Sequence, residues 1–323
     1  MENSKNSSAT AEEKAKEDQE LFLTQLPKVK ICTGFDLFQY QAFWCPSIAI
    51  NGVISFQKHF QAEESDIILV PYRKSGTAWL KTLTFSIPLA YSPHHLIPFV
   101  EFNLYHNNNQ SLDLECFSSS TRRMFSTHVP YASLPSSILS SNCRIVYICR
   151  NPLDQFISEW QFIARRNNSH LDLDEAFERT CKGIQSFGPF WDHVLGYWKA
   201  NKEQSDKILF LKYEDLKEDG TFYIKRMADF LGCPFSEDEV TQGVVQEIAK
   251  LCSLDNIKNL EVIKSGSVNA TGTKNSLFLR KGEVGDWKNY LTPSMSQRLQ
   301  KIVEEKFVGS GLTFKTSLEE PQK

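Results

Sequence analysis

The segment DIILVPYRKSGTAWL, residues 66–80, indicates the fold class more directly than any other part of the sequence. Residues 66–72 form an apolar run of strand length, and a helix is predicted to begin near Ala78. The residues between them, KSGT (74–77), have the composition of a phosphate-binding turn. The common form of such a loop, G-x-x-x-x-G-K-[ST], has its lysine after the second glycine. Here the lysine precedes the glycine, so a different kind of anion loop is expected.

Two later segments repeat the order of strand and helix. CRIVYICR (143–150) is followed by NPLDQFISEWQFIARR (151–166), whose Asn-Pro start and periodicity predict a helix. KILFLKYEDL (207–216) is followed by a second apolar helix around FYIKRMADFLG (222–232). Apolar strands that alternate with helices predict an α/β fold with a central, mainly parallel β-sheet flanked by helices. We expect a single domain that spans residues 26–323.

Lys74, Arg150 and Tyr213 follow the ends of the three predicted strands. Ligands bind beyond the carboxyl ends of the strands in such a sheet, so these side chains are expected to face one site. In the first loop, the N–H groups of residues 75–77 can converge on an anion, helped by the helix N-terminus and the charge of Lys74. For this motif alone, a tight turn with a solvated lysine is the alternative.

Two further groups extend the anion-binding hypothesis. Ser158 lies two helical turns after Arg150 and can face the same side, and residues 280–282 (RKG) add a third basic group. Taken alone, Arg150 is better explained as a surface ion-pair residue. A single ligand with phosphates at two places explains all three groups together, because guanidinium groups bind phosphate with two parallel hydrogen bonds.

Composition excludes several classes of function. The 323-residue chain has a formal net charge of −3, which argues against nucleic acid or acidic membranes as partners. No apolar run approaches the roughly 20 residues that span a bilayer. Residues 1–25 lack the apolar core of a secretion signal and are expected to be a disordered or frayed leader. Eight scattered cysteines and seven histidines without metal-ligand spacing predict reduced thiols, a cytoplasmic location and no metal site.

Three segments are expected to be irregular loops: YSPHHLIP (91–98), NNNQSLDLE (107–115) and IKSGSVNATGTKNS (263–276). The last is rich in Gly, Ser, Thr and Asn and is expected to be mobile. It leads into FLRKGEVGDWKNYLT (278–292), which has too many glycines for a helix and is too basic for the core.

At this point the sequence resembles the cytosolic sulfotransferases that use 3′-phosphoadenosine 5′-phosphosulfate (PAPS). YRKSGTAWL (72–80) is similar to the family's phosphosulfate loop, YPKSGTTWL, and RNPLDQFIS (150–158) to its R-N-x-x-D-x-x-x-S segment. RKGEVGDWKNYLT (280–292) resembles the C-terminal R-K-G-x-x-G-D-W-K-N-x-F-T. The plant branch is indicated by FQYQAFW, THVPYASLP and LCSLDNIKNLEV. The resemblance implies a P-loop-like sulfotransferase fold.

The resemblance implies a role for each matching residue. The residues expected to hold the 5′-phosphosulfate are Lys74, Ser75, Gly76 and Thr77, with Ala78 next to them. Those expected to hold the 3′-phosphate are Arg150, Ser158, Arg280, Lys281 and Gly282. Those expected beside the adenine are Trp79, Tyr213 and Ser253. The resemblance also implies that the reaction requires no metal.

His128, in STHVPY (126–131), matches the family's catalytic base. Taken alone, one histidine among seven is better explained as structural. Imidazole titrates near neutrality without much tuning, which suits proton removal from a hydroxyl. With the resemblance, we expect His128 to take the acceptor proton, Lys74 to neutralise the leaving oxygen, and Ser158 to restrain Lys74 until the acceptor is bound.

The chain departs from the family pattern at several positions. Arg73 replaces a proline, Ala78 replaces a threonine and Leu254 replaces an aromatic residue. These changes bear on donor binding and activity rather than on the fold. The dimer motif found in animal members is degraded here, so a monomer is expected; the residues that remain of it are Lys288, Thr292, Pro293 and Gln297.

The expected acceptor is a small lipophilic alcohol or phenol, of the flavonoid, steroid or oxylipin kind. Aromatic residues expected near the mouth of its pocket are YQAFW (40–44), Phe102, Tyr131 and Trp160. Two rival hypotheses stay open. One is a nucleotide kinase on a similar fold, which requires Mg²⁺, and the other is a catalytically weak or silent nucleotide-binding descendant.

Overall fold

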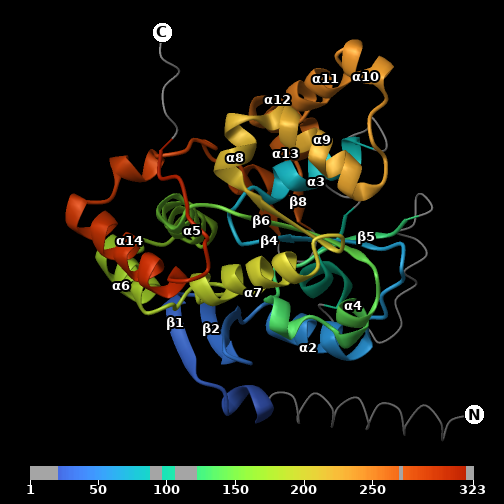
Figure 1. The fold of residues 1–323 in the computed structure, drawn as a ribbon. Helices are drawn as coiled ribbons and strands as arrows, with labels where there is room; N and C mark the ends of the chain where they lie inside the picture. Colours follow the sequence, from blue (N-terminus) through green and yellow to red (C-terminus); the bar gives the residue numbers. More distant parts are fainter. Residues whose placement is uncertain (1–20, 88–96, 106–121, 269–271, 318–323) are drawn as a thin grey trace, which may run out of the picture.

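The structure is a computed structural model that describes residues 21–87, 97–105, 122–268 and 272–317 (Figure 1). Most of the expected leader, the expected loop 107–115 and most of the expected loop 91–98 lie outside these ranges. Of the leader, residues 21–24 form one helical turn.

A four-stranded parallel sheet forms the centre of the molecule. Its strand order is β5-β4-β6-β7, and its strands are β4 (Ile67–Pro71), β5 (Met124–Ser126), β6 (Arg144–Cys149) and β7 (Ile208–Lys212). The three strands expected from the sequence are present, which confirms the α/β fold class. β7 is shorter than the apolar run suggested, because α8 (Tyr213–Glu218) begins directly after Lys212.

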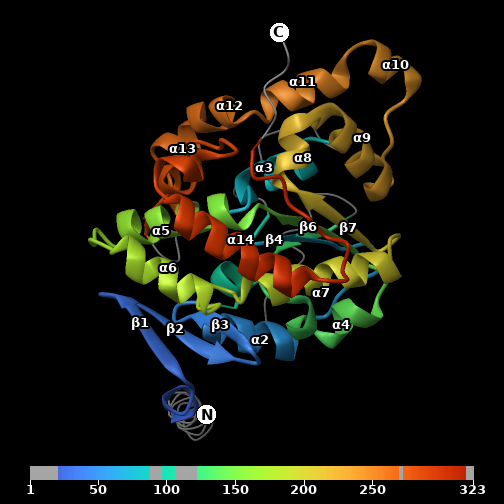
Figure 2. The ribbon, with the colours of Figure 1, turned by 60° about the vertical axis from the view of Figure 1, so that its left-hand side comes forward.

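Helices cover both faces of this sheet (Figures 1 and 2). Because side chains in a strand point alternately to opposite faces, Ile67 and Leu69 of β4 lie in one hydrophobic core and Ile68 and Val70 in another. Helices that pack in the first core are α3 (Thr77–Ser86), α9 (Gly220–Leu231) and α11 (Val244–Leu251). Helices that pack in the second are α2 (Ile50–His59), α5 (Pro152–Arg166), α7 (Phe190–Glu203) and α14 (Pro293–Phe307). The strands are buried on both faces, which explains their unbroken apolar runs.

Shorter helices complete the described parts of the chain. They are α4 (Ser136–Ser140), α6 (Leu173–Cys181), α10 (Glu237–Thr241), α12 (Leu254–Asn259) and α13 (Glu261–Lys264). Single helical turns of other types are Val100–Leu104, Tyr131–Ser133, Asn275–Phe278 and Asp286–Asn289.

Two antiparallel sheets were not expected from the sequence. The first has the order β1-β2-β3 and consists of β1 (Lys28–Cys32), β2 (Phe35–Tyr40) and β3 (Phe43–Pro46). The second is a hairpin of β8 (Ser267–Val268) and β9 (Thr273–Lys274). The prediction of an irregular loop over 263–276 is therefore wrong for these strands, because their backbones pair with each other; residues 269–271 lie outside the described ranges.

Candidate active site

One large cavity, of about 730 Å³, lies beyond the carboxyl ends of β4, β6 and β7. Its size falls within the range of small-molecule sites. The predicted site residues that line it are Lys74, Gly76, Thr77, Ala78, Trp79, His128, Arg150, Ser158, Tyr213, Ser253, Arg280 and Gly282. The structure thus brings together segments that are far apart in the sequence. Ser75 and Lys281 do not belong to the lining.

The loop after β4 is shaped by the left-handed backbone of Gly76. This residue has φ 96° and precedes the first turn of α3. A Cβ atom at Gly76 would lie 2.9 Å from Cδ2 of Tyr213, so both the backbone angle and the close approach require glycine. The first helical hydrogen bond joins Leu80 N–H to the Gly76 carbonyl. The N–H groups of residues 77–79 therefore lie at the positive end of α3, where an anion is stabilised.

Ser75 does not present its backbone as the sequence suggested. Its N–H donates to the carbonyl of Tyr72 at 3.0 Å and closes the turn. Its hydroxyl is buried and has no hydrogen-bond partner among the described residues. Ser75 therefore supports the turn from behind the cavity wall.

The side chain of Lys74 contacts the C-terminal segment and α5. Its Nζ donates to the carbonyl of Phe278 at 3.2 Å and lies 4.3 Å from the ring centroid of Phe162. The partner of its ammonium group is thus a carbonyl of the C-terminal segment, and not Ser158 as expected. Burial, followed by the charge of Arg73, lowers the pKa of Lys74 to about 7. An anion placed beside Lys74 stabilises its charged form and raises this lowered pKa.

Arg150 lies directly after β6 and is 4% exposed. Its guanidinium lies over the ring of Tyr213, with 4.6 Å between Cζ and the ring centroid. Nη2 donates to the carbonyl of Glu283 and lies 3.4 Å from Asp154 Oδ2. Nε is buried with no partner among the described residues. A buried donor without an acceptor destabilises the protein unless a ligand accepts its hydrogen bond.

Asp154 joins the C-terminal segment 278–292 to α5. Its Oδ2 accepts a hydrogen bond from Gly285 N–H at 2.8 Å, and its Oδ1 accepts one from Trp287 N–H at 3.0 Å. Asn151 Nδ2 donates to the same carboxylate at 2.9 Å. The carboxylate is completely buried, so these hydrogen bonds are strong ones. They explain how a segment so distant in sequence reaches the cavity.

Asp286 fixes the two basic residues of that segment. It accepts hydrogen bonds from Arg280 Nη1, from Lys281 Nζ and from Asn289. Burial alone would raise the pKa of Asp286, but these hydrogen bonds outweigh it and lower the pKa to about 2. Lys281 is directed to Asp286 and to solvent rather than into the cavity. Arg280 keeps Nε and Nη2 buried and unpaired among the described residues.

The Tyr213 ring lies between the loop after β4 and the C-terminal segment. Its hydroxyl donates to the carbonyl of Gly282 at 2.8 Å, and its ring meets that of Trp79 edge to face at 5.3 Å. Gly282 has φ 71°, and a Cβ atom there would lie 2.3 Å from Cδ2 of Leu254. Ser253 caps the start of α12 with its hydroxyl. Trp79, Tyr213 and Ser253 thus line the same cavity, next to Leu254 and Gly282.

His128 follows β5 and is 7% exposed. Its Nδ1 lies 2.7 Å from the carbonyl of Pro71. Because a carbonyl can only accept, Nδ1 carries the proton and Nε2 carries the lone pair. Nε2 has no hydrogen-bond partner among the described residues, and burial holds the pKa of His128 well below 6.5. The imidazole is therefore a neutral base at pH 7, and it points its free nitrogen away from Pro71.

Aromatic rings surround this histidine. The ring centroids of Phe99, Phe187 and Phe102 lie 4.6, 5.3 and 6.2 Å from that of His128. The main chain of His128 is fixed as well, because its carbonyl accepts a hydrogen bond from His193 Nε2 at 2.9 Å. The imidazole thus has one orientation in an apolar wall.

Two buried ionisable side chains, Glu101 and Lys81, lie near His128. Glu101 Oε1 accepts the N–H of His128 at 2.8 Å, and burial raises the pKa of Glu101 to about 7. Lys81 donates to the carbonyl of Ile97 and lies 3.7 Å from the ring centroid of Phe99. Burial lowers the pKa of Lys81 to about 7.

Of the aromatic residues expected at the acceptor pocket, Phe102 lines the cavity and the others do not. Tyr131 packs on Tyr197, and Trp160 donates its indole N–H to Leu171. Residues that line the cavity without having been expected there include Ile48, Arg73, Lys81, Phe99, Phe162, Arg166 and Phe278. Lys81 follows Thr77 by four residues on the same helix, a spacing that could have identified it.

No group of three or more His, Cys, Asp or Glu residues in the described part of the chain could hold a metal ion. None of the described helices is long and apolar enough to cross a membrane.

Comparisons with known proteins agree with this architecture. Residues 64–311 match the sulfotransferase domain family. The chain is 44% identical to cytosolic sulfotransferase 15 of Arabidopsis thaliana, with 94% of this chain and 90% of the relative covered. It is 45% identical to cytosolic sulfotransferase 14 of the same plant, with 91% and 90% covered.

Solved structures extend the comparison to the fold. The crystal structure of an Arabidopsis thaliana sulphotransferase superposes with a TM-score of 0.71 at 35% identity, with 91% of this chain and 94% of that chain covered. Mouse sulfotransferase SULT7A1, crystallised with 3′-phosphoadenosine 5′-phosphate (PAP), superposes with a TM-score of 0.70 at 30% identity. The alignment covers 85% of this chain and 95% of that chain. The expected fold is confirmed, and this chain belongs to the sulfotransferase family.

Proposed function

We propose that this sulfotransferase moves a sulfuryl group from PAPS to the hydroxyl of a small lipophilic acceptor, such as a phenol, flavonoid, steroid or hydroxylated oxylipin. The observation that carries the proposal is that Lys74, Arg150 and Arg280 line one cavity. The complex of the mouse relative with PAP supports the class of donor. The names of the plant relatives support a cytoplasmic location. We expect a monomer that needs no nucleic acid, membrane or metal ion.

The residues present fit a nucleotide with two phosphate groups. Three buried guanidinium nitrogens, one on Arg150 and two on Arg280, have no partner in the described structure. They would hold the 3′-phosphate together with Ser158 and the backbone at Gly282. The first N–H groups of α3 and Lys74 would hold the 5′-phosphosulfate. Trp79, Tyr213 and Ser253 would lie against the adenine.

In the proposed reaction, a bond forms between the acceptor oxygen and sulfur while the bond from sulfur to the 5′-phosphate oxygen breaks. PAPS supplies the sulfuryl group and leaves as PAP. His128 takes the hydroxyl proton at Nε2, which is the free nitrogen of its ring. Lys74 neutralises the negative charge on the leaving oxygen. The aromatic residues around His128 exclude water from the acceptor.

The test is a transfer assay with the purified full chain. Labelled PAPS is offered with a panel of phenols and aliphatic alcohols, with and without EDTA. We expect a sulfated product whose rate does not change with the chelator. Transfer that needs Mg²⁺, or transfer from ATP, would instead favour the kinase hypothesis. Tight binding of PAP without product from any acceptor would favour the weak or silent descendant.

A further inference from the structure

Arg73 places a second charge in the cavity wall, next to Lys74, and the family's phosphosulfate loop has a proline at this position. Its side chain is 9% exposed, and its guanidinium lies against two rings, with Cζ 5.2 Å from the centroid of Phe162 and 5.9 Å from that of Phe35. Its Nε is buried without a hydrogen-bond partner among the described residues. Because a buried donor without an acceptor is costly, the Nε–H group is a donor that the described protein atoms leave unsatisfied.

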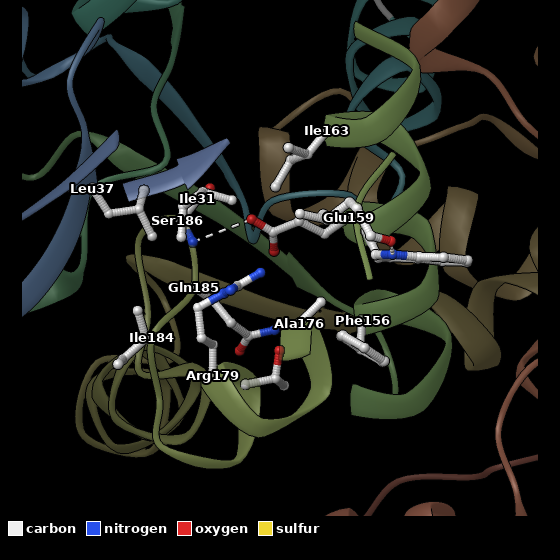
Figure 3. Close-up of a pocket in the computed structure, with 13 residues that line it drawn as sticks. Ile31, Leu37, Phe156, Glu159, Ile163, Ala176, Arg179, Ile184, Gln185 and Ser186 are labelled. Atoms are coloured by element: carbon white, nitrogen blue, oxygen red, sulfur yellow. Dashed lines mark hydrogen bonds between the residues drawn. The ribbon is translucent and has the colours of Figure 1, made fainter. Parts of the chain in front are cut away.

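Glu159 is near Arg73, but its oxygens already bind other groups. Its Oε1 lies 3.8 Å from Arg73 Nε, which is beyond hydrogen-bond range. The same oxygen accepts the N–H of Ser186 at 3.1 Å, and Oε2 accepts from Gln155 at 2.9 Å. Figure 3 shows Glu159 turned toward Ser186. Glu159 therefore offsets part of the charge on Arg73 without saturating its donors.

The surroundings place Arg73 at the end of the cavity where the acceptor reacts. The carbonyl of Pro71, two residues before Arg73, accepts the hydrogen bond of His128 Nδ1 at 2.7 Å, and Arg73 and His128 line the same cavity. Besides burial, the charges of Arg73 and Lys81 also lower the pKa of His128. Arg166 also lines the cavity and acts on Arg73, and its Nε donates to Thr273. Lys81 and Glu101 each have a pKa of about 7 and largely offset each other, so two guanidinium groups, those of Arg73 and Arg166, remain against the carboxylate of Glu159. An excess of positive charge remains there.

We propose that Arg73 binds a carboxylate on the acceptor, so that the preferred acceptors are small hydroxylated carboxylic acids with an apolar skeleton. The planar guanidinium matches a carboxylate with two parallel hydrogen bonds. The rings of Phe99, Phe102 and Phe162 fit the skeleton between the carboxylate and the hydroxyl. This assignment rests on the proposed function, since it names the class of acceptor that reacts at His128.

The test compares matched acceptors that differ only in charge. Aromatic and aliphatic hydroxy acids are each paired with their methyl ester, and kcat and KM are measured with PAPS for the unaltered protein and for Arg73→Met. We expect the unaltered protein to prefer the acids, mainly through KM. Arg73→Met should lower kcat/KM for the acids by about 10- to 100-fold, as expected for a charge-assisted pair, and should change kcat/KM for the esters much less. Arg73→Lys keeps the charge but lacks the planar guanidinium that donates two parallel hydrogen bonds, so it should recover part of the loss.

Arg226→Met is the matched control, because it removes an exposed arginine on α9 and should alter neither class of acceptor. Two results would overturn the proposal: a preference of the unaltered protein for the esters, or an equal loss with acids and esters in Arg73→Met. An equal loss together with weaker PAP binding would assign Arg73 to the donor.

Binding to the complex with PAP separates this inference from the function on which it rests. The acids and esters are titrated by calorimetry into the protein saturated with PAP. If the acids bind in a way that depends on Arg73 but no sulfated product forms, the proposed function is wrong and the anion site is supported. Equal binding of acids and esters would remove the anion site, whatever the turnover.

Discussion

The donor end and the acceptor end of the cavity are built in different ways. At the donor end, most of the lining comes from three short motifs, 74–79, 150–158 and 280–282, with Tyr213 and Ser253 beside them. Much of it is backbone: helix N–H groups and two left-handed glycines. At the acceptor end, single side chains come from separate elements. His128 follows β5, and Phe99 precedes the helical turn of residues 100–104.

This difference indicates how each end can change. A backbone cradle fits one ligand and tolerates few substitutions, since a Cβ atom at Gly282 would clash with Leu254. A wall of separate side chains can change one residue at a time without loss of the fold. The donor should therefore be common to relatives with these motifs, while the acceptor depends on residues such as Arg73 and Phe102.

The largest expected effect is a loss of turnover without a loss of donor binding. His128→Ala should lower kcat by about 10²- to 10⁴-fold, the usual contribution of a general base. The Kd of PAP should stay the same, because His128 lies at the acceptor end. Turnover is measured with the best acceptor of the panel and PAP binding by calorimetry. Unchanged turnover would remove the proposed role of His128, and lost PAP binding would show that the ends are not separate.

Gly282→Ala tests the backbone fit of the donor end. The left-handed φ and the contact with Leu254 should displace the donor wall and weaken PAP binding by about 30-fold or more, since two strained features of roughly 1–3 kcal/mol each sum to at least about 2 kcal/mol. The double variant with Leu254→Ala should recover part of the affinity, because it removes the clash and leaves the backbone strain. If Gly282→Ala binds PAP as tightly as the unaltered protein does, the segment does not form the donor wall.

A smaller effect should appear in the pH dependence of PAP binding. The pKa of Lys74 is about 7 in the free protein, and a bound phosphate raises it, so PAP binding takes up a proton. PAP affinity should therefore fall as the pH rises above 7, by less than tenfold per pH unit. The phosphate groups themselves are already ionised in this range. Lys74→Met should bind more weakly and lose this slope; an unchanged slope would assign the proton to another group.

The contrast between the two ends also explains what the sequence could predict. The sequence could predict the donor end because its motifs are short and can be recognised locally. We therefore expected the segments that contain Gly76, Arg150 and Gly282 to meet in one cavity. The link through Asp154 was not expected, because hydrogen bonds to Gly285 and Trp287 depend on the folded position of the C-terminal segment. The β8–β9 hairpin was also missed, because its strands are too short to show a periodic pattern.

At the acceptor end, sequence reasoning found His128 only through the family resemblance. Its tautomer depends on the Pro71 carbonyl, which no pattern in the sequence predicts. Tyr131 and Trp160 were expected near the mouth of the cavity because of their type, but packing directs both elsewhere. Aromatic residues pack in cores as readily as they line pockets, so composition alone cannot separate the two.

The central claim is that segments far apart in the sequence bind one nucleotide. PAP binding to Arg150→Ala and to Arg280→Ala, measured by calorimetry beside Arg226→Ala, tests it most directly. We predict that each of the first two variants weakens PAP binding by about tenfold or more, as expected for the loss of a charged hydrogen bond, while the third binds as the unaltered protein does. PAP affinity that is unchanged in Arg150→Ala or in Arg280→Ala would contradict the claim.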